Sequence, residues 1–348
     1  MLVNGRKISE KVTPFIIAEL SANHGGSMER AKKSIQAASR AGVSAIKLQT
    51  YTPDTMTINS SKKDFLIENG LWAGKKLYDL YEEAHTPFEW HKGLFDCAKE
   101  EGVTIFSTPF DESAVDLLEE LNAPAYKVAS FEIIDIPLLQ KVAKTNKPIF
   151  LSTGMASQNE IKEAVEVIRQ ISDAGLLLFH CISSYPAPTE ESNLKNMLWL
   201  KKSFDVQIGL SDHTISNVAA LAAIGMGAVA IEKHFKLDDN DCGPDSSFSL
   251  NIDQLSNLVK ECNQAWVAKG QEEFTRSRVE VENTIFRRSL YFIKDLQAGH
   301  IITENDIRRI RPGYGISPKH FPTVIGKAVK KSVKRGEPVT WESFKNNQ

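Results

Sequence analysis

The chain has 348 residues, of which 42% are hydrophobic and 25% are charged, and its formal net charge is −2. These values are ordinary for a globular protein with a full hydrophobic core, and they exclude a fibrous or disordered chain. Because one α/β barrel takes about 250 residues, the length predicts roughly two domains.

Eight short apolar runs, each ending in polar or charged residues, alternate with segments of helical periodicity. The expected strands are residues 15–20, 45–50, 104–109, 125–130, 148–153, 176–181, 206–212 and 229–235. The expected helices are residues 27–40, 87–101, 111–121, 135–145, 157–171, 193–203, 215–224 and 252–268. Eight βα units are the number in a closed (β/α)8 barrel, so the predicted fold class is α/β with a TIM barrel.

Signals between these elements refine the prediction. Ser27 is a plausible N-cap of the first helix, and Gly42 is a plausible stop signal. The connection 51–87 is longer than a normal βα loop, so we expect it to be functional or partly helical. Three aromatic residues in or next to this connection are expected to pack against the protein rather than bind a ligand: Trp72, Tyr81 and Trp90.

The chain is expected to consist of a barrel domain, 1–269, a charged linker with some helix, 270–285, and a compact irregular domain, 286–348. The last segment holds 13 Lys and Arg against 5 Asp and Glu, whereas the remainder holds 29 against 39. The basic small domain therefore either docks on an acidic barrel or attracts an anionic ligand, and the charge pattern does not separate these roles.

Several classes of protein are not indicated. The segment 1–14 is polar and lacks the apolar core of a signal peptide, and no run approaches the roughly 18 apolar residues of a membrane span. The cysteines Cys97, Cys181, Cys242 and Cys262 form no CxxC pair, which argues against a disulfide framework or a zinc ribbon. No GxxxxGK or GxGxxG loop is present. We expect a cytoplasmic, reduced protein without nucleic-acid or membrane partners.

Active sites of (β/α)8 barrels lie at the carboxyl ends of the strands, where this chain places two histidines. His213 and His234 end neighbouring strands, and Asp245 follows in the next loop. Two imidazoles with a carboxylate, water or substrate oxygen suit Mn²⁺, Mg²⁺, Fe²⁺ or Zn²⁺. The pattern therefore predicts a divalent metal site without choosing the ion.

Lys47 and Lys127 extend from two other strands, and their role stays open at this point. They could form ion pairs with Glu19 or Glu132, form a Schiff base, or clamp a phosphate. The polar surroundings argue against a strongly lowered lysine pKa, which favours the phosphate clamp, with hydroxyl donors from Ser130, Ser152 and Ser211. Glu19 and Glu132 could act as acid or base, or could only anchor the lysines.

The motifs along the chain occur in a recognisable order: FIIAELSANHGG, AIKLQTYTPDT, STPF, YKVASFE, LSTGMAS, HCISSYPAP, GLSDHT, IEKHF, GPDSSFSL and RPGYGISP. Over nearly the whole chain they resemble the sialic acid synthase family. Within it the chain is similar to the pseudaminic acid branch. SANH stands where the sialic and legionaminic branches usually have G[VI]NH, and the QTYTPDT and GLW segments agree.

The resemblance implies a (β/α)8 barrel followed by a SAF domain, a small β-clip fold similar to type III antifreeze proteins. In the family, the SAF domain of one subunit covers the barrel of the other in a domain-swapped homodimer. The family reaction condenses phosphoenolpyruvate with an N-acetylated amino sugar, uses a divalent metal such as Mn²⁺ or Mg²⁺, and releases phosphate by C–O cleavage. In the pseudaminic branch the sugar is 2,4-diacetamido-2,4,6-trideoxy-L-altrose, and the product feeds glycosylation of surface structures such as flagellin.

The same resemblance assigns roles to individual positions. It implies metal ligation by His213 and His234, and an acid or base role for Glu132. The positions that match phosphoenolpyruvate binding are Lys47, Thr108, Lys127, Ser130, Ser152, Ser183 and Ser211; Ser183 stands where some members have Asn. The positions that match sugar binding are Glu19, Gln49, Tyr185, Asp245 and Arg311, the last contributed by the partner subunit.

Other functions are compatible with parts of the pattern. N-acetylneuraminate or legionaminic acid synthesis shares the catalytic residues and differs only in the sugar. A Schiff-base barrel and a carbohydrate-binding module without turnover are further alternatives. Ice binding by the last domain is disfavoured, because ice faces are weakly charged and this segment carries 13 basic residues.

Overall fold

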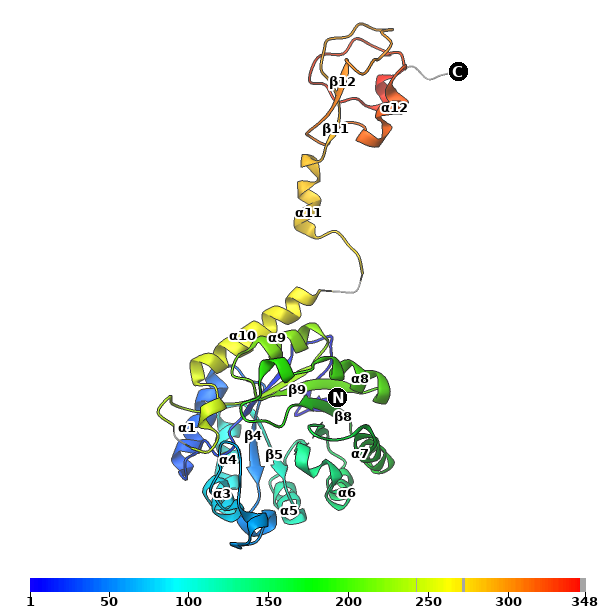
Figure 1. Cartoon of the computed structure of the whole chain (residues 1–348). Coiled ribbons are helices and arrows are strands. Elements are labelled where there is room, and N and C mark those ends of the chain that lie inside the picture. The colour runs from blue at the N-terminus through cyan, green and yellow to red at the C-terminus, as the bar shows by residue number, and fades with distance from the viewer. Residues whose placement is uncertain (242, 271–272, 345–348) are drawn as a thin grey trace. The chain divides into compact units, whose positions relative to one another are not determined.

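The computed structural model describes residues 1–241, 243–270 and 273–344. The chain divides into two compact units, Met1–Gly270 and Gln271–Gln348, which are taken in turn (Figure 1). Within the described ranges, no helix is long and apolar enough to cross a membrane. Cys97, Cys181 and Cys262 are free and buried, whereas Cys242 lies outside the described residues.

The first unit is a closed barrel of parallel strands, in the order β10-β3-β4-β5-β6-β7-β8-β9. This confirms the predicted TIM barrel. The strands are β3 (Phe15–Glu19), β4 (Ala45–Thr50), β5 (Thr104–Pro109), β6 (Tyr126–Val128), β7 (Ile149–Ser152), β8 (Leu176–Cys181), β9 (Gln207–Asp212) and β10 (Ala230–His234). A short antiparallel hairpin of β1 (Leu2–Val3) and β2 (Arg6–Lys7), which the sequence did not predict, precedes the barrel.

Helices follow the strands along the chain. They are α1 (Met28–Arg40), α2 (Pro53–Met56), α3 (Leu77–Ala84), α4 (Phe88–Glu100), α5 (Glu112–Glu120), α6 (Ile136–Lys144), α7 (Gln158–Ile171), α8 (Lys195–Phe204), α9 (Val218–Gly225) and α10 (Ile252–Lys269). Ser27 caps α1 as predicted, because its hydroxyl accepts the Arg30 N–H at 3.3 Å. The long connection is partly helical, since it contains α2 and α3.

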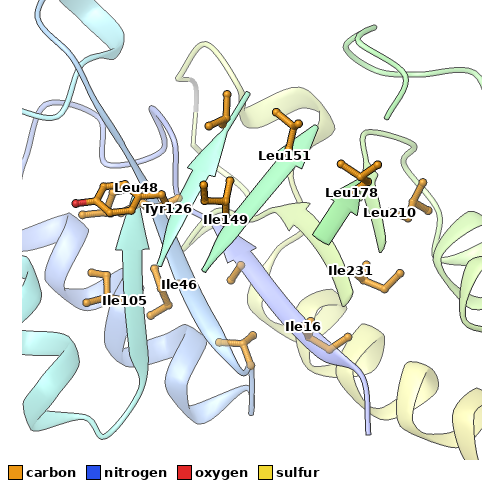
Figure 2. Close-up of a cluster of buried hydrophobic side chains, with 14 of the residues drawn as sticks. Ile16, Ile46, Leu48, Ile105, Tyr126, Ile149, Leu151, Leu178, Leu210 and Ile231 are labelled. Carbon is orange, nitrogen blue, oxygen red and sulfur yellow. The ribbon is translucent and has the colours of Figure 1, made fainter. Parts of the chain in front are cut away.

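Alternation along each strand builds two separate apolar layers. Outward-facing residues such as Ile16, Ile46 and Leu210 pack with helix side chains, and Figure 2 shows this cluster. The residues between them face the inside of the barrel, where Phe106 and Phe150 stack at 5.2 Å between ring centroids. Because the inner layer is filled by large rings, space for a ligand is left only beyond it, at the ends of the strands.

The second unit contains α11 (Arg278–Glu282), an antiparallel pair of β11 (Ser289–Phe292) and β12 (Ile307–Ile310), and α12 (Phe321–Val324). Helix α11 lies within the segment that the sequence predicted as a partly helical linker. The unit has its own apolar core, formed by Leu290, Phe292, Leu296, Ile302, Ile307, Ile316, Val324, Val329, Val333, Val339 and Phe344.

Candidate active site

Polar side chains meet inside the barrel at the carboxyl ends of the strands. The alternation that turns Phe15 and Ile17 inward also turns Glu19 inward, and the same periodicity applies to the other strands. It brings together most of the residues that the sequence singled out: Glu19, Lys47, Gln49, Thr108, Lys127, Ser152, Ser211 and His234. These polar side chains lie directly above the inner apolar layer and form the floor of a pocket at the carboxyl ends of the strands.

Two lysines and two glutamates form the centre of this floor. Lys47 Nζ lies 2.7 Å from Glu19 Oε2 and 3.6 Å from Glu232 Oε1, and Lys127 Nζ lies 3.8 Å from Glu232 Oε1. All four side chains are buried. The predicted ion pair of Lys47 with Glu19 is present. Lys127 pairs with Glu232, not with Glu132, because Glu232 has the inward position two residues before His234.

Burial and charge shift the proton affinities of these groups in different directions. Burial raises the pKa of Glu19 to about 7, although Lys47 opposes this. Burial also acts to raise the pKa of Glu232, but Lys127 and Lys47 outweigh it, so that pKa lies below its ordinary value. When Glu19 is protonated, two ammonium groups face one carboxylate. The cluster is then net positive, which favours an anionic ligand.

The two lysines themselves differ. Burial acts to lower the pKa of Lys47, but the two glutamates outweigh it and raise that pKa. Burial lowers the pKa of Lys127 despite Glu232. The polar surroundings had argued against a strongly lowered lysine pKa, and for Lys127 the direction of the shift is downward. The nearby Lys47 ammonium group adds to this lowering, whereas the Phe179 ring, 5.7 Å from Lys127 Nζ, favours the charged form.

Hydroxyl groups surround the ammonium groups. Thr108 Oγ1 accepts from Lys47 at 3.1 Å, and Ser152 Oγ accepts from Lys127 at 2.7 Å. Gly154 packs between two further serines, since a Cβ there would lie 2.3 Å from Ser183 Oγ and 2.7 Å from Ser130 Oγ. The loop after β7 can approach these hydroxyls only without a side chain at 154. The group of donors matches the chemistry of a phosphate site.

The two predicted metal ligands lie side by side, with 5.5 Å between the ring centroids of His213 and His234. His213 Nδ1 lies 2.9 Å from the Ile182 carbonyl and donates to it when the ring is neutral, which leaves the Nε2 lone pair available. His234 Nδ1 is buried without a hydrogen-bond partner, and Asp245 Oδ2 lies 3.8 Å away. Burial and the nearby His213 hold the pKa of His234 well below its usual range.

These imidazoles fit a metal site of a particular kind. No group of three or more His, Cys, Asp and Glu side chains arranged for a metal occurs among the described residues. The paired rings of His213 and His234 offer a donor set that suits a divalent ion taking two imidazole nitrogens from the protein and oxygen atoms from water or substrate. Neutral His234, with an unpartnered nitrogen in a buried position, is the observation that supports this fit.

An aromatic wall stands beside the histidines. The Tyr185 ring lies 4.4 Å from the His213 ring and 5.2 Å from Phe248. Trp72, from the long connection, lies 5.9 Å from Tyr185 and donates from Nε1 to the Pro244 carbonyl at 3.0 Å. Trp72 was predicted to be a packing residue, and the structure places it against the site.

The other two aromatic residues of that prediction do pack. The ring of Tyr81 contacts Tyr51 at 5.8 Å, and the ring of Trp90 contacts His24 at 5.6 Å. Neither ring partner is a predicted site residue, although the pKa of Tyr81 is raised by burial and, after it, by the nearby predicted site residue Glu132.

Asn23 ties the loop that carries Asp245 to the barrel. Its amide donates to the Phe235 carbonyl at 2.7 Å and to Ser249 Oγ at 2.8 Å, and Ser249 in turn donates to the Asp245 carbonyl at 2.6 Å. The sequence showed the motif around Asn23 but no role for it. Gln49 holds the other side of the pocket floor by donating to Glu19 Oε1 at 2.9 Å.

Glu132 lies within electrostatic range of Lys127, whereas Arg311 belongs to the second unit. Glu132 lies in a short turn after β6, where its Oε2 atom is buried without a hydrogen-bond partner, and burial raises its pKa to about 7. Arg311 is an exposed residue of the second unit, and its role stays a prediction.

Each of the two units of the chain matches a known protein family or domain. Residues 34–274 match the NeuB family, and residues 287–345 match the SAF domain. The pseudaminic acid synthase of Campylobacter jejuni subsp. jejuni serotype O:23/36 (strain 81-176) is 42% identical over 331 residues, which are 95% of this chain and 96% of that protein. The pseudaminic acid synthase of Helicobacter pylori is 41% identical over 335 residues, 96% of this chain and 98% of that protein.

The fold has solved counterparts as well. The crystal structure of an N-acetylneuraminic acid synthetase from Leptospira borgpetersenii, in complex with citrate, matches with a TM-score of 0.73 and 29% identity. That match covers 81% of this chain and 94% of the other.

Proposed function

Because the chain belongs to the NeuB family, we propose that it is an enzyme that condenses phosphoenolpyruvate with 2,4-diacetamido-2,4,6-trideoxy-L-altrose and water. The products are pseudaminic acid and phosphate. The observation that carries the proposal is the adjacency of an anion site and a pair of buried imidazoles. Lys47, Lys127 and their hydroxyl neighbours form the first, and His213 and His234 form the second.

Lys47 and Lys127 bind the phosphate and carboxylate oxygens of phosphoenolpyruvate, together with Thr108, Ser130, Ser152, Ser183 and Ser211. When the phosphate attracts Lys47, Glu19 loses its strongest opposing charge and holds its proton more tightly. Protonated Glu19 and Gln49 then form hydrogen bonds to the sugar. This coupling increases the protonated fraction of Glu19 once the first substrate has bound.

Carbon 3 of phosphoenolpyruvate attacks the sugar aldehyde, whose oxygen takes up a proton, and Glu19 is the donor. Water adds at carbon 2 and gives a proton to Glu132, whose pKa of about 7 suits a general base near neutral pH. Phosphate then leaves by C–O cleavage, held by the two lysines, while the new hydroxyl at carbon 2 transfers its proton to the departing phosphate and becomes the keto oxygen. Much of the rate comes from holding both substrates in this geometry.

The cofactor in this proposal is a divalent cation, Mn²⁺ or Mg²⁺, held by His213 and His234. When bound, it supplies a Lewis acid for the aldehyde oxygen. The Tyr185 ring contacts the His213 ring at a tilt and, with Asp245, orients the sugar. Burial raises the pKa of Asp245, and its carboxyl oxygens can accept hydrogen bonds from sugar hydroxyls.

The proposal extends to the assembly. The SAF domain, predicted as residues 286–348, places Arg311 at the sugar site of a partner subunit in a domain-swapped homodimer. Basic residues outnumber acidic ones in this domain, whereas acidic residues outnumber basic ones in the rest of the chain, and these opposite charges favour the contact. We place the protein in the cytoplasm, where phosphoenolpyruvate is made, and its product in the glycosylation of flagellin or another surface structure.

The test is phosphate release from phosphoenolpyruvate with Mn²⁺ or Mg²⁺ and three acceptors in parallel, each with an EDTA control. The acceptors are the diacetamido-trideoxy-altrose, N-acetylmannosamine and the diacetamido-trideoxy-mannose. EDTA-sensitive turnover with the altrose sugar alone supports the proposal. Turnover with one of the manno sugars would support the same mechanism but would assign the enzyme to N-acetylneuraminate or legionaminic acid synthesis. No phosphate from any acceptor refutes the enzyme and favours a binding module.

A further inference from the structure

Behind the two histidines, on the outer side of the barrel wall, lies a buried ion pair that the proposed reaction does not use. Asp212 on β9 and Lys233 on β10 are direct neighbours in the strand register. Their side chains are each 1% exposed, and Lys233 Nζ lies 2.6 Å from Asp212 Oδ2. Each residue directly adjoins a proposed metal ligand, since His213 follows Asp212 and His234 follows Lys233.

The ammonium group of Lys233 is fully used. Besides Asp212, it donates to the Thr214 carbonyl at 2.6 Å and to the Ser216 carbonyl at 3.0 Å. Asp212 Oδ1 accepts the Thr214 N–H at 2.9 Å. The backbone that follows His213 is thus tied to one side chain of the neighbouring strand, and the same side chain binds the Asp212 carboxylate that precedes His213. These bonds also explain why α9 begins at Val218 rather than near 215, since the carbonyls of 214 and 216 are turned toward Lys233.

A purely structural role would not require charges here. A buried ion pair loses much of its Coulomb energy to desolvation, and an apolar pair of similar volume is often equally stabilising. An apolar pair, however, could not bind the carbonyls of 214 and 216. The distinctive effect of this pair is to fix where the chain turns after β9, and therefore where the His213 ring lies relative to His234.

We propose that Asp212 and Lys233 are positioning residues that hold the two imidazoles at the separation a divalent cation requires. The inference rests on the proposed function, because it takes His213 and His234 as the ligands. Neither Asp212 nor Lys233 touches substrate or the ion in this proposal. Groups that orient metal ligands from behind are typically worth about 10- to 100-fold in metal affinity.

The experiment measures Mn²⁺ binding to the full-length protein through the electron paramagnetic resonance signal of free Mn²⁺, with the melting temperature of each variant recorded. The variants are Lys233→Met, Asp212→Asn and the double variant. Ser44→Ala is the control, because Ser44 Oγ accepts the Ile16 N–H at 2.9 Å in a buried position near the start of β3 and β4. This control lowers the melting temperature without acting on the turn after His213.

We expect Lys233→Met and Asp212→Asn to weaken Mn²⁺ binding by about 10- to 100-fold. The double variant removes both charges, so it regains melting temperature relative to Lys233→Met, but its Mn²⁺ affinity stays low because the two carbonyls have lost their shared donor. Ser44→Ala binds Mn²⁺ as the wild type does.

Wild-type affinity in the double variant would overturn the positioning role and leave the proposed function intact. Absence of Mn²⁺ binding in the wild type itself would instead overturn the metal ligands of the proposed function, and this inference with them. Asp212→Asn keeps the shape of the side chain, so it provides a folded variant if Lys233→Met does not fold.

Discussion

Replacing Glu132 by glutamine is expected to stabilise the barrel at alkaline pH while abolishing most of its activity. Glu132 Oε2 is buried without a hydrogen-bond partner, and burial raises the pKa of this carboxyl from 4.5 to about 7. Between these two values the folded protein binds a proton that the unfolded chain releases, so the free energy of unfolding falls as the pH rises. The stabilising contribution is complete below pH 4.5 and is lost once the pH passes about 7.

The size of the effect follows from the pKa difference. A tenfold change in proton affinity is worth about 1.4 kcal/mol, so ionised Glu132 destabilises the fold by roughly 3 kcal/mol relative to its neutral form. Glutamine has nearly the same shape and never ionises. Glu132→Gln therefore stabilises the protein by about 2–3 kcal/mol more at pH 8 than at pH 5, which corresponds to roughly 5 °C in melting temperature.

The assay is thermal unfolding of the wild type and the variant at pH 5 and pH 8, with phosphate release measured on the same preparations. Loss of a general base should lower kcat by about 100-fold or more. Glu166→Gln is the control for a lost negative charge, because the Glu166 side chain is 58% exposed on α7. An equal melting-temperature difference at both pH values would refute the burial argument, and unchanged kcat would refute the role of Glu132 as base.

Three further predictions concern the other parts of the site. Lys127→Met should weaken phosphoenolpyruvate binding by about 100-fold, since a buried charge at the proposed phosphate position is lost; calorimetry tests this, with exposed Lys92→Met as control, and a change below threefold would remove Lys127 from the phosphate site. His234→Gln should abolish Mn²⁺ binding while the circular dichroism spectrum stays that of the wild type; retained binding would show that another residue holds the ion. Trp72→Phe removes the donor to the Pro244 carbonyl but keeps a ring. The KM for the sugar should therefore rise by roughly 3- to 10-fold at constant KM for phosphoenolpyruvate, and a rise in the latter instead would contradict the placement of Trp72 at the sugar.

The barrel could be predicted from the sequence because the periodicities of strands and helices involve residues only a few positions apart. Strands and helices alternate at the expected places, and most boundaries agree within one or two residues. The period of two along a strand also determines which side chains face inward. Lys47 follows two residues after Ala45, and Lys127 two after Ala125, so the apolar residues of the inner layer already indicated the polar residues of the site. The same count would have found Glu232, which lies two residues before His234.

The sequence could not supply what depends on contacts between distant segments. Trp72 contacts Tyr185, which is more than a hundred residues away in the sequence. Asn23 binds Phe235 and Ser249, which are more than two hundred residues away in the sequence. Lys233 faces away from the site, and its role becomes visible only through the three groups that it binds.

Proton affinities depend on the tertiary structure for the same reason. The pKa of Glu19 rises while that of Glu232 falls, although both are glutamates at strand ends within one cluster. Desolvation acts on both, and the net direction is decided by how many ammonium groups lie within about 4 Å of each. Residue type and strand periodicity are local properties and can be read from the chain, whereas burial and charge balance are sums over the neighbours that only the folded barrel brings together.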